Sequence, residues 1–404
     1  MDHELLAYDV YVGIDIGKYK HYVLAQTAKD QKTVLSKEVK QDEKEIRDVL
    51  DECSAFGRML VAVDQKGSIG KLVVVTTKAV GIDIGFLTPN DFYNFSKGYS
   101  EVKSDAHDAY IISDVAMRFT HRLFAIDDEE GEAQESLKAL CASRKALVEE
   151  NTRDKNRIRA SLIQTHPSLE AIIDRDDLDR AVYLHILMRY GGSEGIRKAG
   201  QNKLEGFIAK QPYYKNKASE LAERIFGALS MQTVSMPGAA AREAAIKQAA
   251  ASIIARNARI DTLEDQIEVL YRSFPDSAVL DSVPGVGKVY GPVMLSEIGD
   301  IEQYKDAGHL AAYSGTGPSK RQSGKTLDTA KKKVKCNRRL KEAFCQSAWS
   351  SVSWDEWSAW YYNKKRAEGK EHRQAILALA RHRTDIIYAM LKNGSLYEPK
   401  TMKP

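Results

Sequence analysis

The sequence is poor in cysteine and has no long apolar run. Its 404 residues include four cysteines, and no two of them form a Cys-x-x-Cys pair, so nothing indicates a disulfide framework or a zinc site. No apolar stretch approaches the roughly 18 residues that a membrane-spanning helix needs. The first residues, MDHELLAYDV, are acidic and lack the basic start of a signal peptide. We therefore expect a cytoplasmic protein with no membrane partner.

Extremes of composition are also missing. Hydrophobic residues make up 43% of the chain and charged residues 29%, which argues against long disorder or a fibrous protein. A chain of 404 residues exceeds the size at which one hydrophobic core keeps growing. We therefore expect two or three domains.

The chain does have a local excess of positive charge. Its net charge is only +4, yet residues 318–345 contain ten Lys or Arg residues against two acidic residues, a net +8. The rest of the chain is therefore −4. A basic block in a near-neutral chain predicts a polyanionic partner that binds at one place, with a solvated charged face as the simpler alternative.

The first 120 residues have the pattern of a mixed α/β domain. Apolar runs at 9–17, 20–27 and 32–39 predict an antiparallel meander of three strands. The pattern then alternates, with helices expected at 43–53, 68–79 and 105–119 and strands at 59–64 and 81–87. This order, β-β-β-α-β-α-β-α, describes a mixed sheet with helices packed on it.

The rest of the chain is helical by pattern. Residues 131–165 are charged, with apolar residues near heptad spacing, which predicts a long arm or a coiled coil. Residues 167–236 show broken helical patterns and no recognisable chemistry, so we interpret them as an inserted helical region. A further helix at 239–274 leads into a compact, mostly helical domain. The predicted divisions of the chain are 1–125, 126–236 and 237–404.

Four aspartates are the candidate catalytic residues. Asp105 and Asp108 lie three positions apart at the start of a predicted helix, where like charges repel by roughly 0.2–0.5 kcal/mol. An N-cap role for Asp105, with Asp108 near the positive helix end, is the alternative that needs no ligand. Asp15 and Asp64 each end an apolar strand, where a carboxylate is costly without a partner. Because both strands can converge on the start of that helix, we predict one site with four acids.

Such a site suits a divalent cation. Carboxylate oxygens are natural ligands of Mg²⁺, and Mn²⁺ is the alternative ion. Two such ions, about 3.5–4 Å apart, can stabilise both the attacking and the leaving oxygen at a phosphorus centre. We therefore predict that one or two Mg²⁺ ions bind to the four aspartates and support phosphoryl transfer.

Three motifs, GIDIGKYK, VAVDQKG and KSDAHDA, resemble the acidic motifs of the DEDD transposases of bacterial insertion sequences. A later run from SVPGVGKVYGPVMLSEIGD to CNRRLKEAF is similar to the C-terminal domain of the same family. The resemblance implies a RuvC-like RNase H-fold catalytic domain at 1–125, a helical arm with an insertion at 126–236 and a C-terminal transposase domain at 237–404. The implied metal-binding tetrad is Asp15, Asp64, Asp105 and Asp108.

One position departs from the family pattern. Asp64 stands in a D-Q-K-G context where the family usually has Glu in an E-A-T-G context. The shorter side chain loses about 1.5 Å of reach, the length of one C–C bond. A water-bridged metal contact or a neighbouring acid are the alternatives to direct binding by Asp64.

The resemblance also implies a nucleophile, Ser323, in the segment SKRQSGKT. From the residues alone, a loop serine with no special role is the simpler interpretation. In the family, a serine in a matching Ser-Gly loop is thought to attack DNA and form a phosphoserine link, assisted by the acidic site with Mg²⁺. The implied active site combines both domains, taken from different subunits.

The resemblance implies several partners. Family members act on donor and target DNA and are guided by a structured noncoding bridge RNA that pairs with both. Joining two DNAs requires at least two strand cleavages, so a homodimer or homotetramer is expected. We also expect association with the nucleoid when DNA is bound.

Glycine-rich and basic segments are the candidate nucleic-acid contacts. VPGVGKVYG at 283–291 predicts a hairpin between helices whose amides and lysine can hold a phosphate, with a plain helix–helix turn as the alternative. The basic block beside Ser323 favours polyanion binding. The predicted nucleic-acid-binding residues are Lys18, Lys103, Gly285, Gly287, Lys288, Lys320, Arg321, Lys325, Lys331, Lys332, Lys333, Arg338 and Arg339.

All four tryptophans lie between residues 349 and 360. Base stacking is one interpretation. The helical spacing of Trp354, Trp357 and Tyr361 favours a packed aromatic face instead.

Three alternatives to a serine recombinase stay open at this stage. The segment GIDIGKYKHYVLA also resembles the phosphate-binding hairpin of actin-like ATPases and sugar kinases, but the second hairpin and the Gly-Gly motif of that superfold are not where they should be. A nucleic-acid scaffold with a decayed acidic site would explain Asp64. A RuvC-like nuclease or junction resolvase would use metal-activated water in place of Ser323.

Overall fold

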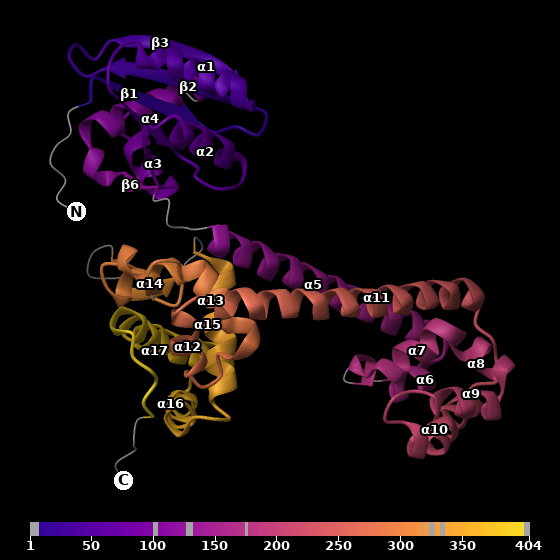
Figure 1. The fold of residues 1–404 in the computed structure, drawn as a ribbon. Coiled ribbons are helices and arrows are strands. Elements are labelled where there is room, and N and C mark those ends of the chain that lie inside the picture. The colour runs from indigo at the N-terminus through magenta and orange to yellow at the C-terminus, as the bar shows by residue number, and fades with distance from the viewer. Residues whose placement is uncertain are drawn as a thin grey trace. The chain divides into compact units, whose positions relative to one another are not determined.

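The computed structural model of the chain describes residues 8–99, 104–126, 132–173, 177–317, 319–322, 328–331 and 336–399. The chain divides into two compact units, Met1–Glu129 and Glu130–Pro404. Figure 1 shows that the first unit is α/β and that the second is built mainly of helices. This architecture confirms the predicted fold class. The predicted three-part division of the chain stays a prediction.

A six-stranded mixed sheet, in the order β3-β2-β1-β4-β5-β6, is the base of the first unit. Its strands are β1 (Val10–Asp15), β2 (Lys20–Thr27), β3 (Thr33–Lys40), β4 (Met59–Val63), β5 (Asp83–Phe86) and β6 (Phe124–Ala125). The first three strands pair antiparallel, as the predicted meander requires. Strand β4 is parallel to β1, and β5 is parallel to β4, because helical crossovers separate these strands in the chain.

Helices cover both faces of the sheet, since side chains alternate along each strand. On one face, Val10, Val12 and Ile14 pack in a core with α1 (Glu43–Ser54) and α2 (Lys71–Ala79). On the other face, Tyr11 packs in a core with α4 (Asp105–Arg118) and with aromatic residues of α3 (Pro89–Ser96). The result is three layers, with α4 lying against the central strand β1.

The sequence pattern did not predict α3 and β6. Helix α3 spans eight residues and has the segment PNDFYNFS, too short to show helical periodicity. Strand β6 has two residues and exists through its pairing with β5. Elements of this length depend on tertiary contacts more than on local preference.

Two long helices form the arm of the second unit (Figure 1): α5 (Glu132–Thr165) and α11 (Ala239–Arg272). They run antiparallel, because Arg144 pairs with Glu264 at 2.6 Å and Asn151 donates to the Asn257 side chain at 2.7 Å. At 34 residues each, the helices are about 51 Å long. The arm predicted from heptad spacing is therefore an intramolecular helix pair.

A helical cluster lies at the far end of this arm. It consists of α6 (Pro167–Ile172), α7 (Ala181–Tyr190), α8 (Ser193–Ala199), α9 (Gln201–Ile208) and α10 (Ala218–Ser230). Its core includes Leu187, Leu221 and Ile225, packed against Ile158 of α5 and Ile253 of α11. The inserted region predicted at 167–236 is thus helical and shares a hydrophobic core with the far end of the arm.

The near end of the arm packs into a second helical core. The elements of this C-terminal domain are α12 (Asp276–Asp281), α13 (Gly287–Ile298), α14 (Ala307–Ser314), β7 (Ser319–Gln322), β8 (Asp328–Lys331), α15 (Arg338–Ser351), α16 (Glu356–Ala367) and α17 (His372–Asn393). Leu137 of α5 is buried among Met294, Phe344 and Leu379 of these helices. The five 3-10 helices of the chain are η1 (Ser68–Gly70), η2 (Thr120–Arg122), η3 (Asp177–Asp179), η4 (Lys215–Lys217) and η5 (Ile301–Gln303), counted within the described residues.

None of the helices in the described part of the chain combines the length and the apolar character needed to span a bilayer.

Candidate active site

Two of the four predicted acids lie at the same edge of the sheet. Asp15 is the last residue of β1, and Asp64 directly follows β4. These strands are neighbours and parallel, with Ile14 paired to Val63, so their carboxyl ends meet. The backbone N–H of Ile16 donates to Asp64 Oδ1 at 3.2 Å. Asp64 is therefore held beside the strand that carries Asp15.

Helix α4 brings the other two acids to this edge. A Cβ atom on Gly13 would lie 2.2 Å from the Ala109 carbonyl oxygen, so β1 and α4 are in backbone contact there. The Ser113 hydroxyl donates to the Tyr11 carbonyl at 2.9 Å. The strand and the helix run in opposite directions, since Tyr11 contacts Ser113 and Gly13 contacts Ala109. Two residues further along β1 is Asp15, and four residues, or about one turn, back along α4 is Asp105.

The N-cap of α4 is Ser104, whose side chain accepts from the His107 N–H at 3.2 Å. The capping alternative for Asp105 is therefore wrong: Asp105 is the first residue inside the helix. Asp105 and Asp108 both lie in its first turn, where the backbone N–H groups favour negative charge. Asp105 is exposed, and it is not the residue that caps the helix.

The charges of the four carboxylates act on one another. Burial raises the pKa of Asp15 to about 7, and the negative charges of Asp64 and Asp108 add to this shift. Asp105 acts in the same direction. Burial also raises the pKa of Asp64, against the lowering effect of the hydrogen bond from the Ile16 N–H. All four predicted acids are thus brought within electrostatic reach at one site.

The carboxylates described at this edge do not have the close spacing of a metal-binding group. In the parts of the chain that the structure describes, no group of three or more His, Cys, Asp or Glu side chains has the arrangement of a metal site. The donor set nevertheless fits a hard divalent cation, because it consists of carboxylate oxygens. The repulsion that raises the pKa of Asp15 is what a bound cation would relieve.

The β1–β2 turn lies beside the acids. Lys18 is exposed, and its Nζ lies 4.9 Å from the centroid of the Tyr19 ring. Tyr19 is 75% exposed. Lys20 instead pairs with Glu38 at 2.5 Å. Sequence reasoning selected Lys18 and did not consider Tyr19, another exposed side chain of this turn. Lys103 lies outside the described residues.

Ser323 cannot be placed beside these acids, because residues 323–327 lie outside the described residues, as do Lys332 and Lys333. Lys325 is in the same undescribed stretch. On either side of it, β7 and β8 pair antiparallel, with Gln322 opposite Asp328. The backbones of Lys320, Arg321 and Lys331 belong to this ribbon.

The hairpin predicted at 283–291 is only partly a turn, because residues 282–286 connect α12 to α13 and residues 287–291 are the start of α13, as the alternative of a plain helix–helix turn requires. Gly285 has φ +83°, and a Cβ atom there would lie 2.5 Å from the Ser347 carbonyl of α15. The buried Arg383 donates to the Pro284 carbonyl and to Ser347 Oγ. Gly285 is therefore required by packing. Gly287, with φ +56° and no close neighbour, starts α13 and lies next to the exposed Lys288.

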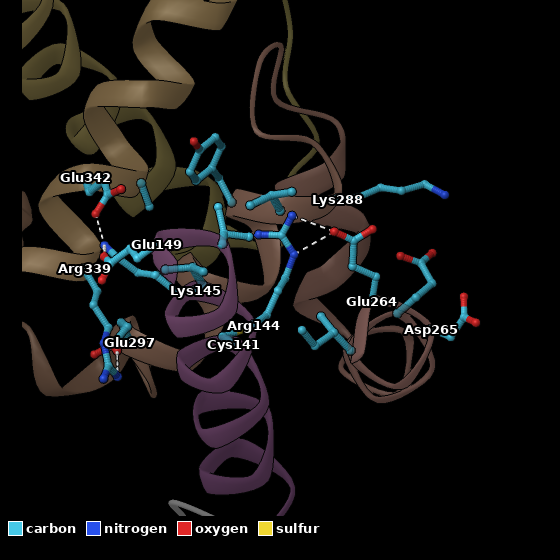
Figure 2. Close-up of a pocket in the computed structure, with 17 residues that line it drawn as sticks. Cys141, Arg144, Lys145, Glu149, Glu264, Asp265, Lys288, Glu297, Arg339 and Glu342 are labelled. Carbon is cyan, nitrogen blue, oxygen red and sulfur yellow. Dashed lines mark hydrogen bonds and ion pairs between the residues drawn. The ribbon is translucent and has the colours of Figure 1, made fainter. Parts of the chain in front are cut away.

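A cavity of about 310 Å³ lies beside this hairpin, between α5, α11, α13 and α15. Figure 2 shows that Lys288 extends away from the paired charges that line it. Arg339 instead bonds to Glu297 at 3.2 Å, a carboxylate whose side chain is 5% exposed. Arg338 is exposed. Lys288 and Arg338 are thus the more accessible cations of this predicted set, and Arg339 has a structural partner.

The tryptophan prediction is only partly right. Trp357 and Tyr361 stack at 5.2 Å between ring centroids and pack against the C-terminal core. Trp354 does not belong to this face: it precedes α16, whose N-cap is Asp355, and is 78% exposed. The helical spacing was extended to Trp354, which lies two residues before the first residue of α16, Glu356.

Two family models match this chain, one over an N-terminal segment that includes the acidic site and one over a segment of the C-terminal domain. A family model described as a transposase, of the DEDD type, matches residues 12–167, and one described as the transposase IS116/IS110/IS902 family matches residues 277–363. The chain is 36% identical to the uncharacterised 43.6 kDa protein of insertion element IS110 from Streptomyces coelicolor, over 97% of this chain and 96% of that protein. It is 30% identical to the 44.8 kDa protein of insertion element IS116 from Streptomyces clavuligerus, over 96% of each.

The chain belongs to the IS110 family of insertion-element transposases. The uncharacterised 42 kDa protein of insertion element IS900 from Mycobacterium paratuberculosis is also similar, at 29% identity over 98% of this chain and 99% of that protein. As an IS110-family transposase the protein is a DNA-processing enzyme, which excludes the actin-like ATPase or sugar kinase alternative. The first family match includes all four aspartates and the second includes Ser323. Residues 168–276 lie outside both matches.

Proposed function

We propose that this transposase cleaves and exchanges DNA strands in a Mg²⁺-dependent reaction in which Ser323 is the nucleophile. The observation that carries the proposal is the meeting of Asp15, Asp64, Asp105 and Asp108 at one sheet edge. Burial raises the pKa of Asp15 to about 7, and the like charges of the other three acids add to the shift, a perturbation typical of functional sites. Asp15 and Asp64 come from strands, and the other two acids from the first turn of α4.

The four aspartates would hold one or two Mg²⁺ ions, or Mn²⁺ in their place. When bound, such an ion supplies positive charge that stabilises the phosphate oxygens during phosphoryl transfer. Asp105 and Asp108 lie in the first turn of a helix whose N-cap is Ser104, which accepts the capping bond from the His107 N–H. Asp64 is oriented by the hydrogen bond that its Oδ1 accepts from the Ile16 N–H.

Ser323 would attack the scissile phosphate. An Oγ–phosphorus bond forms as the bond from phosphorus to one sugar oxygen breaks, the hydroxyl proton is released, and the departing sugar oxygen is protonated. The covalent link keeps the energy of the broken bond, so a second sugar hydroxyl can later displace the serine and join a new strand. Lys320, Arg321 and Lys325 are adjacent in sequence and would stabilise the charge on phosphorus.

The remaining predicted cations would position nucleic acid. Lys18 lies beside the acidic site, and Lys288 and Arg338 are exposed in the C-terminal domain. We assign to Lys103, Gly287, Lys331, Lys332 and Lys333 the same role toward the phosphate backbone. The proposal also includes a bridge RNA that pairs with donor and target DNA, and a homodimer or homotetramer whose subunits complete one another's active sites.

A covalent adduct tests the serine mechanism. Purified protein is incubated with Mg²⁺ and a labelled DNA substrate that contains the insertion-element ends, together with RNA transcribed from the element. We expect a protein–DNA adduct that survives denaturation and disappears in Ser323→Ala. The matched control Ser319→Ala should keep the adduct. If the adduct disappeared in Ser319→Ala but not in Ser323→Ala, Ser319 would be the nucleophile instead.

Asp105→Asn separates the metal site from the alternatives. We expect it to abolish cleavage while leaving DNA binding intact. Cleavage that depends on Asp105 and Mg²⁺ but forms no adduct would support the nuclease using metal-activated water. Cleavage by neither wild type nor variant would support the scaffold. Sequencing the nucleic acid that copurifies with the protein tests the guide, because the proposal requires one discrete RNA.

A further inference from the structure

The helical cluster at the end of the arm carries a loop with unusual surface chemistry. This arm-tip loop, residues 209–217, connects α9 to α10 and lies outside both family matches. Its backbone is held by successive turns: the Gln211 N–H donates to the Ile208 carbonyl at 2.9 Å, and the Tyr214 N–H donates to the Gln211 carbonyl at 3.2 Å. The Lys217 N–H donates to the Tyr214 carbonyl at 3.0 Å. The loop thus has a backbone fixed by turns, while most of its side chains are exposed.

Its two consecutive tyrosines point to different environments. Tyr214 packs against the hydrophobic core of the cluster. Tyr213 is 98% exposed and has φ +65°, a left-handed conformation that is rare for a bulky residue. No packing of the ring explains this conformation, since the ring is in solvent. Pro212 restricts the backbone just before it. The loop therefore presents an aromatic ring outward on a constrained backbone.

The charged residues next to this ring in the sequence are all positive. Lys210, Lys215 and Lys217 are exposed, and none of them makes an ion pair with another described residue. No acidic residue occurs from residue 206 to residue 219, and the nearest acids in sequence are Glu205 and Glu220. Other lysines of the same unit, which are partly buried, are paired, such as Lys145 with Glu342 and Lys365 with Glu368. The arm-tip loop keeps its positive charge available.

From this juxtaposition we propose that the arm-tip loop binds a single-stranded nucleic-acid segment, with Tyr213 stacking on an unpaired base and the three lysines contacting phosphates. An exposed aromatic ring among cations is the combination that holds single strands without reading their sequence. Duplex DNA would leave Tyr213 without a base face to stack on. The arm holds this contact at the far end of helices about 51 Å long, a span of about 15 nucleotides at 3.4 Å each.

The proposal does not depend on Ser323 or on the metal site, so its test uses binding alone. Full-length protein carrying Ser323→Ala is titrated against 20-nucleotide oligo-dT and oligo-U by fluorescence anisotropy at several salt concentrations. We expect Tyr213→Ala to weaken binding about tenfold, and Tyr213→Phe to keep the affinity, because stacking needs only the ring. A larger effect on one of the two oligonucleotides identifies the strand as DNA or RNA.

The lysines have a separate readout. Replacing Lys210, Lys215 and Lys217 together by Gln should reduce the slope of log Kd against log salt by about 2, since each phosphate contact contributes about 0.7 for single strands. A control with Lys29, Lys32 and Lys44, three exposed lysines of the first unit, should keep the slope. The proposal would be overturned by an equal reduction of the salt slope in the control, or by an unchanged affinity in Tyr213→Ala. A change of oligomeric state in the variants with unchanged affinity would also overturn it.

Discussion

At the scale of residues, the acidic site places four carboxylates where burial and mutual repulsion oppose the charged form of Asp15. Asp15 and Asp64 are partly buried at strand ends, and Asp105 and Asp108 add two more charges from one helix turn. Single-charge partners stabilise many other acids in the chain, such as Glu38 and Glu264. For Asp15, by contrast, every electrostatic influence identified is repulsive. A cation of charge two would reverse that balance.

Asp15→Asn should therefore change stability in opposite directions with and without metal. Because the pKa of Asp15 is raised to about 7, the folded chain binds a proton between pH 4 and 7 that the unfolded chain does not. Its contribution to stability thus falls as the pH rises through this window. At pH 8 in EDTA, Asp15→Asn should stabilise the protein by about 1–2 kcal/mol, less than the full shift implies because solvent screens the site.

Thermal unfolding with and without Mg²⁺ measures both effects. Wild type should gain stability on adding a millimolar excess of Mg²⁺, whereas Asp15→Asn should gain little. Asp48→Asn, at an exposed position of α1, serves as the control and should behave like wild type in both buffers. Equal Mg²⁺ stabilisation of wild type and Asp15→Asn would contradict the metal site.

At the scale of elements, the arm depends on polar groups in its interior. Asn151 and Asp154 of α5 are 6% and 9% exposed, and Arg256 of α11 bonds to both. Such a buried network costs stability relative to apolar packing but is satisfied in only one helix register. The register determines where the arm-tip cluster sits along α5 and α11. Helix pairing and cluster position are thus linked.

The junction of the arm with the cluster contains a pH-sensitive cap. His166 is fully buried, and its Nδ1 accepts from the Leu169 N–H at 3.2 Å, which caps α6. Burial lowers the pKa of His166, and the nearby Arg197 adds to the effect. The unfolded chain therefore binds a proton that the folded chain does not, and stability is lost as the pH falls below the unfolded value of 6.5.

Urea unfolding followed by circular dichroism at pH 7 and pH 5 tests this cap. Wild type should lose up to about 2 kcal/mol across this range from His166, the limit reached if the imidazole stays neutral in the fold. His166→Asn keeps a side-chain oxygen that can accept the capping bond but has no charge to gain. Its stability should depend less on pH by the same amount. An identical pH dependence in the two proteins would exclude His166 as the cause.

At the scale of the whole molecule, the proposed active site needs residues from two separate units. The four aspartates belong to Met1–Glu129, and Ser323 belongs to Glu130–Pro404. The C₂ symmetry that most dimers have allows the aspartates of one subunit to act with the serine of its partner. Each subunit then contributes to two sites.

Mixing two inactive variants distinguishes this arrangement from one within a single subunit. Asp105→Asn and Ser323→Ala are combined in equal amounts under conditions that exchange subunits, and strand cleavage is measured. In the arrangement across subunits, half of the dimers are mixed and one of their two sites is intact, so about a quarter of wild-type cleavage should return. No recovery, with subunit exchange verified by differently tagged copies, would place both groups in one subunit.

Local pattern was sufficient to predict much of the fold. The alternation of apolar residues predicted β1, β2, β3 and β4 close to their observed bounds, because period-two burial is a property of the strand itself. Heptad spacing predicted α5, and the motif resemblance indicated the family. Short elements such as α3 and β6, and the start of α16 after Trp354, were not predicted, since tertiary contacts and capping determine them.

By itself the sequence determined which residues carry charge, which segments form helices and strands, and which acids are candidates for a metal. Tertiary structure alone decided that these acids meet. Asp15 and Asp105 are far apart in the chain, and they are brought to one edge because Gly13 has no side chain to keep α4 away from β1. It also decided that Tyr213 faces solvent while Tyr214 faces the core. Local preference cannot encode either result, because both depend on which surfaces the folded chain has left to pack against.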